Sequence, residues 1–171
     1  FVGQHGHDTV RCARNVPTLM SRHRVRARPP RAPSPEPARR VTHGSELTAY
    51  LEDAAHFPDG HSSLVVCPRD EQQLATVLRD ATTVLPVGAQ SSLTGGATPM
   101  GDTVISLSEL SSIAPPELDS VTAEAGVTLT ALREALSGAG RAYPPVPTYE
   151  GATVGGVVST NAAGAATFKY G

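Results

Sequence analysis

The chain has 171 residues, with 14 basic side chains, 16 acidic side chains and two cysteines. Its length suits one ordinary domain with an additional segment. The cysteines, Cys12 and Cys67, are single and distant, which argues against a disulfide framework or a zinc knuckle. No apolar run approaches the ~20 residues of a membrane span. Because the chain opens with Phe1 and stops at Gly171 just after a motif, we expect an N-terminal fragment of a longer protein.

Charge divides the chain sharply. Residues 1–43 hold nine arginines against two acids, whereas residues 44–171 hold five basic residues against fourteen acids. We therefore predict a disordered basic Pro/Arg-rich tail over 1–43, whose place in the native protein stays open, and a folded acidic domain over 44–171. An acidic domain would repel a phosphate backbone, so we expect no nucleic-acid binding there. A cytoplasmic location is expected, with peripheral membrane association or organelle targeting left open.

The first half of the domain predicts a β-α-β unit. A helix is expected over 45–54, with Ser45 as a possible N-cap. A buried strand follows at 64–67. Asp70 is typical of an N-cap, with Gln73 reaching back, and the helix after it has a stripe of apolar residues that we expect to be buried. The strand 84–87 completes the unit, which is a natural setting for parallel strands.

The second half predicts strands at 103–107 and 121–125. Leu129, Leu132 and Leu136 mark a helix that ends near Gly138 or Gly140. A short helix is expected over 153–159, after an extended proline-rich connector.

Two glycine-rich stretches carry most of the functional information. The first glycine segment, residues 85–96, reads Leu-Pro-Val-Gly-Ala-Gln-Ser-Ser-Leu-Thr-Gly-Gly. Its glycines permit positive φ and close approach of a ligand to the backbone, and its small hydroxyl side chains add donors. Backbone N–H groups can hold a pyrophosphate without lysine or arginine. Neither the G-x-G-x-x-G fingerprint nor a P-loop is present, and a surface turn is the structural alternative.

The second glycine segment, residues 151–164, reads Gly-Ala-Thr-Val-Gly-Gly-Val-Val-Ser-Thr-Asn-Ala-Ala-Gly. Asn161 is of a residue type that tolerates left-handed backbone or caps a turn, and both roles stay open. On its own, this segment would also suit a small-residue helix packed closely against a sheet.

Taken in order, the motifs resemble one family. Pro-Val-Gly-Ala-Gln-Ser-Ser-Leu-Thr-Gly-Gly at 86–96, Tyr-Pro-Pro-Val-Pro at 143–147, Gly-Ala-Thr-Val-Gly-Gly at 151–156 and Asn-Ala-Ala-Gly at 161–164 are similar to the vanillyl-alcohol oxidase/PCMH type of FAD-binding domain. The resemblance covers about residues 46–171 and is greatest to the glycolate oxidase and D-lactate dehydrogenase branch. It implies an α+β fold, with a small β-α-β subdomain and a mixed or antiparallel sheet with helices, here truncated.

The resemblance also implies FAD as cofactor and a set of contact residues. The residues around the pyrophosphate, flavin and ribityl chain would be Val87, Gly88, Ala89, Gln90, Ser91, Ser92, Gly95, Pro145, Gly151, Ala152, Thr153, Gly155, Gly156, Ser159, Thr160 and Asn161. The first glycine segment has no histidine, which covalently flavinylated relatives carry there, so FAD is expected to bind non-covalently. Val146 stands where the branch often has aspartate, and any polar contact from that position is lost.

By the same resemblance, the full-length protein would oxidise a 2-hydroxy acid, D-lactate or glycolate, and pass electrons to an unknown acceptor. The substrate is thus a small molecule. Catalytic residues would lie downstream of Gly171, so none is named and this chain alone is expected to be inactive. No metal site is expected, despite the spacing of His5, His7 and Cys12. Two alternatives stay open: a truncated FAD-binding module without turnover, and a sugar or aryl-alcohol oxidase of the same superfamily.

Overall fold

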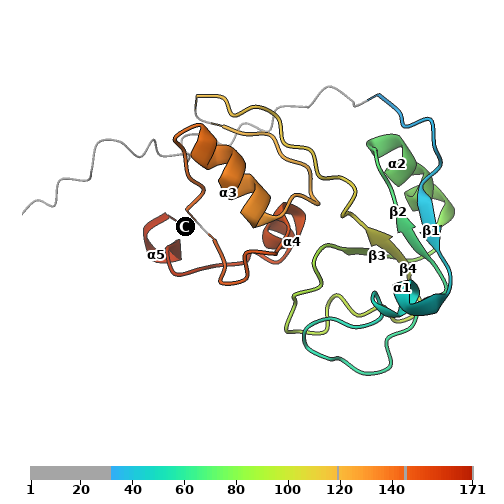
Figure 1. Ribbon diagram of the computed structural model, residues 1–171. Coiled ribbons are helices and arrows are strands. Elements are labelled where there is room, and N and C mark those ends of the chain that lie inside the picture. The colour runs from blue at the N-terminus through green and yellow to red at the C-terminus, as the bar shows by residue number, and fades with distance from the viewer. Residues whose placement is uncertain (1–31, 119, 145, 171) are drawn as a thin grey trace, which may run out of the picture.

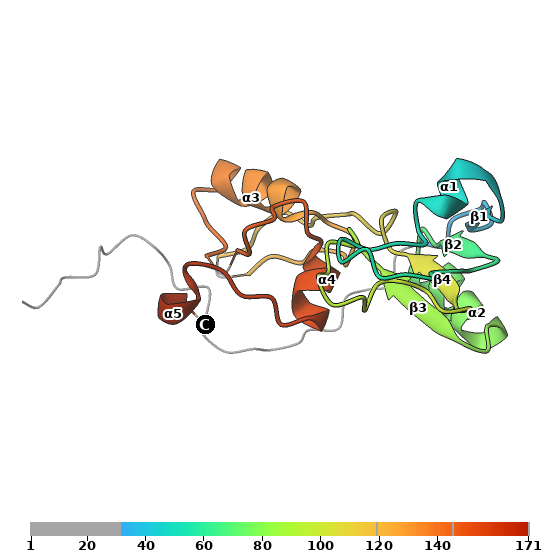
Figure 2. The ribbon, with the colours of Figure 1, turned by 90° about the horizontal axis from the view of Figure 1, so that it is seen from below.

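The computed structural model describes residues 32–118, 120–144 and 146–170. The described chain has two parts (Figure 1). One holds a four-stranded sheet with the helices α1 and α2, and the other holds the helices α3, α4 and α5. Both views place α4 nearer to the sheet than α5 (Figures 1 and 2).

The sheet has the order β1-β2-β4-β3, formed by Arg39–Val41, Val65–Cys67, Thr103–Ser106 and Val84–Val87. β1 is antiparallel to β2, and the other three strands are parallel. The predicted strands at 64–67, 84–87 and 103–107 are confirmed. β2 and β3 are parallel as expected, but β4 lies between them, so the β-α-β crossover through α2 skips one strand position.

β1 corrects the boundary between tail and domain. Arg39 to Val41 lie within the segment expected to be disordered, yet they pair with Cys67 to Val65 in the sheet. Val41 is buried, with 5% of its surface exposed, and belongs to the core cluster formed by alternate residues of the sheet. The charge change at residue 43 therefore does not mark where the fold begins. The residues before 32, including His5, His7 and Cys12, lie outside the described part.

The two helices of this part lie on opposite sides of the sheet (Figure 2). α2, Glu71–Asp80, begins as predicted, because the Asp70 carboxylate accepts the Gln73 N–H at 2.8 Å. The Gln73 side chain reaches one residue further back, to the Arg69 N–H. The expected burial of its apolar stripe is wrong: no α2 residue is buried, and Leu78 is 50% exposed.

The helix expected over 45–54 is short. α1 covers only Gly44–Thr48, and its N-cap is His43 rather than Ser45. Beyond the helix, the carbonyls of Tyr50 and Glu52 accept hydrogen bonds from the Gln90 side chain. A tertiary contact thus replaces the helical turns that the apolar spacing predicted.

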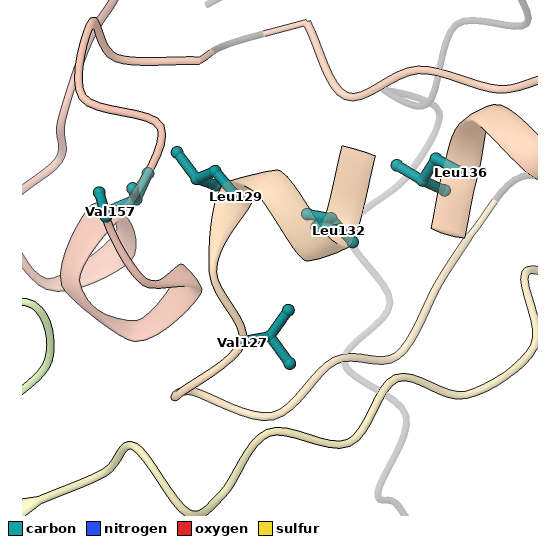
Figure 3. Close-up of a cluster of buried hydrophobic side chains, with 6 residues drawn as sticks. Val127, Leu129, Leu132, Leu136 and Val157 are labelled. Carbon is teal, nitrogen blue, oxygen red and sulfur yellow. The ribbon is translucent and has the colours of Figure 1, made fainter. Parts of the chain in front are cut away.

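The second part has its own core. α3 (Leu129–Gly138) and α4 (Val154–Ser159) confirm the predicted helices, and α5 covers Thr167–Tyr170. Figure 3 shows buried side chains along α3, with Val157 of α4 near Leu129 and with Val127 on the chain that leads into α3. The buried residues of this core are Val127, Leu129, Leu132, Leu136, Ala152 and Val157.

The strand predicted at 121–125 is wrong. Only Ala123 forms an antiparallel bridge there, with Ile113, although neighbouring backbone groups also pair. Pro115 and Pro116 follow the partner segment and cannot donate to a ladder, which stops the pairing from growing. In the described part of the chain, no helix is long and apolar enough to cross a bilayer.

Candidate cofactor site

The first glycine segment leaves the sheet at the end of β3. Val87 is buried, and its carbonyl accepts the Leu107 N–H at 3.1 Å, so the chain is fixed up to this point. Beyond it, within the described residues, the backbone N–H groups of residues 88–92 donate to no protein acceptor. Five consecutive unpaired donors at the carboxyl ends of the three parallel strands are suited to binding an anion.

The two glycine segments meet at Gly88 and Thr153. A Cβ atom added to Gly88 would lie 2.2 Å from the Thr153 Oγ1 atom, well inside contact distance. Thr153 is buried and caps α4, the helix that both views place nearer to the sheet than α5 (Figures 1 and 2). Segments more than sixty residues apart in sequence thus form one wall, which requires glycine at position 88.

Glycine serves different purposes within the first segment. Gly95 adopts a positive φ of +75°, as the sequence led us to expect of these glycines. Gly88 and Gly96 do not adopt positive φ, so the backbone angle does not explain glycine at these two positions. The hydroxyls of Ser92 and Thr94 lie 2.9 Å apart and hydrogen-bond to each other. Ser91 is half-buried, and Ala89 is exposed.

Gln90 is placed in the segment, but its side chain is already used. The Nε2 atom lies 3.0 Å from the Tyr50 carbonyl, 3.2 Å from that of Glu52 and 3.0 Å from that of Ala97. Of the hydrogen-bond donors of Gln90, only the backbone N–H is left for a ligand. Sequence reasoning gave Gln90 a ligand contact and did not predict this internal role.

The second glycine segment has no comparable row of unpaired donors at the start of α4. The Val154 and Gly155 N–H groups donate at 2.8 Å to the carbonyls of Val127 and Ala125. The Gly156 N–H donates to the Thr153 hydroxyl at 3.2 Å. This segment can therefore shape the site and contact a ligand through side chains, while its first helical turn offers no backbone N–H.

The remaining predicted residues divide into buried and exposed groups. Ala152 belongs to the core, and Gly151 allows close approach to the Tyr149 ring. Asn161 adopts φ +48°, which confirms its expected left-handed backbone. The exposed predicted residues at the end of α4 are Ser159, Thr160 and Asn161. Pro145 lies outside the described residues.

An ion cluster occupies the same edge of the sheet, beyond β2 and β4. Glu109 bridges Arg39 Nε at 3.0 Å and Arg69 Nε at 2.8 Å, while Glu46 pairs with Arg39 and Glu36 with Arg69. Hydrogen bonds from Arg69 and then Arg39 hold the pKa of Glu109 below its ordinary value. Sequence reasoning missed this cluster, because its members come from four separate segments.

The thiol next to this cluster is shielded from solvent. Cys67 is fully buried, and burial raises the pKa of its thiol.

A separate cavity of about 340 Å³ lies between α2 and the sheet, on the face of the sheet away from Cys67. Its lining includes Arg40, Val66 and Val77. None of the predicted cofactor residues that the structure describes lines it, which separates this cavity from the site.

Comparison with known proteins identifies the ligand class. A family described as an FAD binding domain matches residues 62–171. The chain belongs to this family. A D-lactate dehydrogenase of Archaeoglobus fulgidus is 35% identical over 114 residues, which are 63% of this chain and 26% of the relative. A D-lactate dehydrogenase of Anaerostipes hadrus is 32% identical over 142 residues, 78% of this chain and 30% of the relative. The matched part of this chain thus spans less than a third of either relative.

Solved structures support the fold. An alkyldihydroxyacetonephosphate synthase superposes with a TM-score of 0.68 at 17% identity, covering 77% of this chain and 28% of that one. A cholesterol oxidase from B. sterolicum gives 0.59 at 18% identity, covering 81% and 28%. At these identities the likeness concerns the fold alone. It confirms the predicted α+β, PCMH-type FAD-binding fold.

The residues present fit FAD, the cofactor that the family indicates. Its pyrophosphate is an anion that needs hydrogen-bond donors at close range, and residues 88–92 supply unpaired N–H groups next to a glycine. Hydrogen bonds to charged groups contribute roughly 1.5–3 kcal/mol each. Several of them outweigh the several kcal/mol that immobilising a ligand costs.

Proposed function

We propose that this domain binds FAD non-covalently and that it serves a flavin-dependent oxidoreductase acting on a 2-hydroxy acid of the D-lactate or glycolate type. The row of unpaired N–H groups at residues 88–92 carries the cofactor part of the proposal. The substrate part is supported by two relatives named D-lactate dehydrogenase and by a D-2-hydroxyglutarate–pyruvate transhydrogenase of Saccharomyces cerevisiae, 26% identical over 134 residues. All three names describe chemistry on 2-hydroxy acids.

FAD, when bound, supplies the redox chemistry by accepting two electrons from the substrate. The chain's own contribution is to bind and orient it. We assign the pyrophosphate to the backbone of residues 88–92, and the flavin and ribityl side to residues 151–156 and 159–161. Gly88 would permit close approach of the phosphate, and Thr153 would complete the wall beside it. We assign the catalytic residues to the part of the full-length protein that follows Gly171, and no residue of this chain to catalysis.

The non-covalent attachment rests on the first glycine segment, which holds no histidine to form a bond to the flavin. Acid precipitation of the purified full-length protein tests it. We expect all flavin in the supernatant. A yellow pellet would show a covalent bond and would contradict this part of the proposal.

The reaction is tested by anaerobic mixing of the full-length protein with D-lactate, glycolate and, as a control, L-lactate. We expect the flavin absorbance near 450 nm to bleach with D-lactate or glycolate. Bound FAD that none of the three acids reduces would favour an FAD-binding module without turnover or a different substrate class. A cytoplasmic location stays a prediction, which cell fractionation would check.

A further inference from the structure

We propose that Gln90 and Asp53 are positioning residues that clamp the first glycine segment in the conformation that leaves its donors unpaired. The inference rests on the proposed FAD site and adds to it two side chains that hold the site from behind. Neither residue is required to touch the cofactor through its side chain.

The Gln90 amide ties the segment to the chain that follows α1. Its Nε2 atom is within 3.0–3.2 Å of the carbonyls of Tyr50, Glu52 and Ala97. Three carbonyls only accept hydrogen bonds, so the amide nitrogen rather than the oxygen belongs among them. The Gln90 carbonyl in turn accepts the Ala54 N–H at 2.9 Å. Both the side chain and the backbone of Gln90 are therefore anchored.

Asp53 anchors the far end of the same segment. It is buried, with 4% of its surface exposed, and its Oδ1 atom accepts the Ala55 N–H at 3.0 Å. Its Oδ2 atom accepts the Ala97 N–H at 3.3 Å. Because Gln90 binds the carbonyl of Ala97 and Asp53 binds its N–H, Ala97 is held on both sides. Residues 91–96 thus span two fixed points.

The backbone of Gln90 gives an independent reason to assign it a role. Its φ is +47°, a left-handed value that glycine, asparagine or aspartate adopts more readily than glutamine. Such strain persists where the surrounding structure over-determines it, and it concentrates at ligand sites. The three hydrogen bonds of the side chain are what a glycine at this position would lack.

A clamp of this kind should affect affinity through preorganisation. A loop with five unpaired N–H groups can satisfy them by rearranging, unless something holds it. If the competent loop becomes a minor state, the apparent Kd for FAD rises by the inverse of its population. The fully bound state keeps the same contacts, so its stoichiometry and flavin spectrum should not change.

The test compares full-length wild-type protein with Gln90→Asn. Asparagine keeps the amide and tolerates left-handed backbone, but it is one methylene too short to reach the three carbonyls. We expect the Kd for FAD to rise about tenfold, with one FAD per chain and an unchanged spectrum at saturation. Asp53→Asn, which replaces one acceptor oxygen by a donor, should weaken binding in the same way. Gln72→Asn on the exposed side of α2 is the matched control, with unchanged Kd.

The outcomes separate this inference from the proposed function. A wild-type protein that binds no FAD contradicts the proposed function itself. Wild-type binding with an unchanged Kd in Gln90→Asn overturns the clamp. A lower stoichiometry at unchanged Kd also overturns the clamp, because that result reports partial unfolding only. An altered flavin spectrum overturns it as well, because that result reports direct contact of the Gln90 side chain with the flavin. If Gln90→Asn does not fold, Asp53→Asn decides by the same criteria.

Discussion

The two glycine segments look alike in sequence and differ in how their backbone donors are used. In the first, the N–H groups of residues 88–92 have no protein acceptor among the described residues, and the segment is tied down through side chains instead. In the second, the N–H groups of Val154, Gly155 and Gly156 are all bonded within the protein. Glycine at 88 and at 155 each allows two segments of the fold to touch, and we propose that only the glycine at 88 also opens a ligand site.

The largest effect is expected at Gly88. A valine there would overlap the Thr153 hydroxyl and block a phosphate, so we expect FAD affinity of the full-length protein to fall at least about a hundredfold. Equilibrium titration of flavin fluorescence measures it, and circular dichroism checks folding. Gly138→Val is the control, since nothing lies within 4 Å of a Cβ at Gly138. Unchanged affinity in a folded Gly88→Val protein would remove this segment from the site.

An alanine at Gly155 should affect mainly the stability of the fold rather than the binding of FAD. An alanine Cβ would lie 2.8 Å from the Ala125 Cβ and 3.0 Å from its carbonyl oxygen, neither of which can rotate away. We expect a loss of about 1–3 kcal/mol in the free energy of unfolding, with a much smaller loss of FAD affinity than in Gly88→Val. Thermal unfolding and FAD titration separate the two quantities, with Gly138→Ala as the control. A large loss of affinity without a loss of stability would make the two segments equivalent.

The smallest expected effect concerns two acids, Glu109 at the carboxyl ends of the strands and Glu150 directly before the second glycine segment. Glu109 is partly buried between two arginines, whereas Glu150 pairs with Arg133 and both are exposed. Both carboxyl pKa values are lowered by these arginines. Each contribution is therefore complete above the unfolded value, near 4.3, and is lost as the pH falls through the lowered value.

We expect Glu109→Gln to cost ~1 kcal/mol at neutral pH and to flatten the acid limb of the stability curve. Glu150→Gln should have a smaller effect, because solvent screens its pair. Urea unfolding at a series of pH values from neutral to acid checks both variants. Equal effects would show that burial at the sheet edge does not strengthen the Glu109 pair.

Features with a local cause were predictable from sequence. The strand 84–87, the Asp70 cap, α3 and α4 all follow from apolar spacing and capping chemistry within a few residues. The contact of Gly88 with Thr153 follows only in outline: the resemblance placed both residues at one cofactor, but not against each other. Motif order thus predicted that the two glycine segments lie together, but not which of their residues touch.

Features that depend on distant contacts were not predictable. β1 carries a basic, proline-flanked sequence typical of a tail, and only its pairing with β2 makes it a strand. The helix after Ser45 stops early because Gln90, forty residues on, binds the carbonyls that follow it. Asp53 has no motif around it, and its carboxylate acquires a role only when residue 97 comes near.

Amide hydrogen exchange with and without FAD tests the central claim most directly, because it reports each backbone N–H separately. In the free full-length protein, we expect fast exchange at residues 88–92 and slow exchange at residues 154–157, where the donors are already bonded. Saturating FAD should slow exchange at 88–92 and leave 154–157 nearly unchanged. Protection that appears at 154–157 while 88–92 continues to exchange fast would contradict the account, because the phosphate would then be held by the second segment.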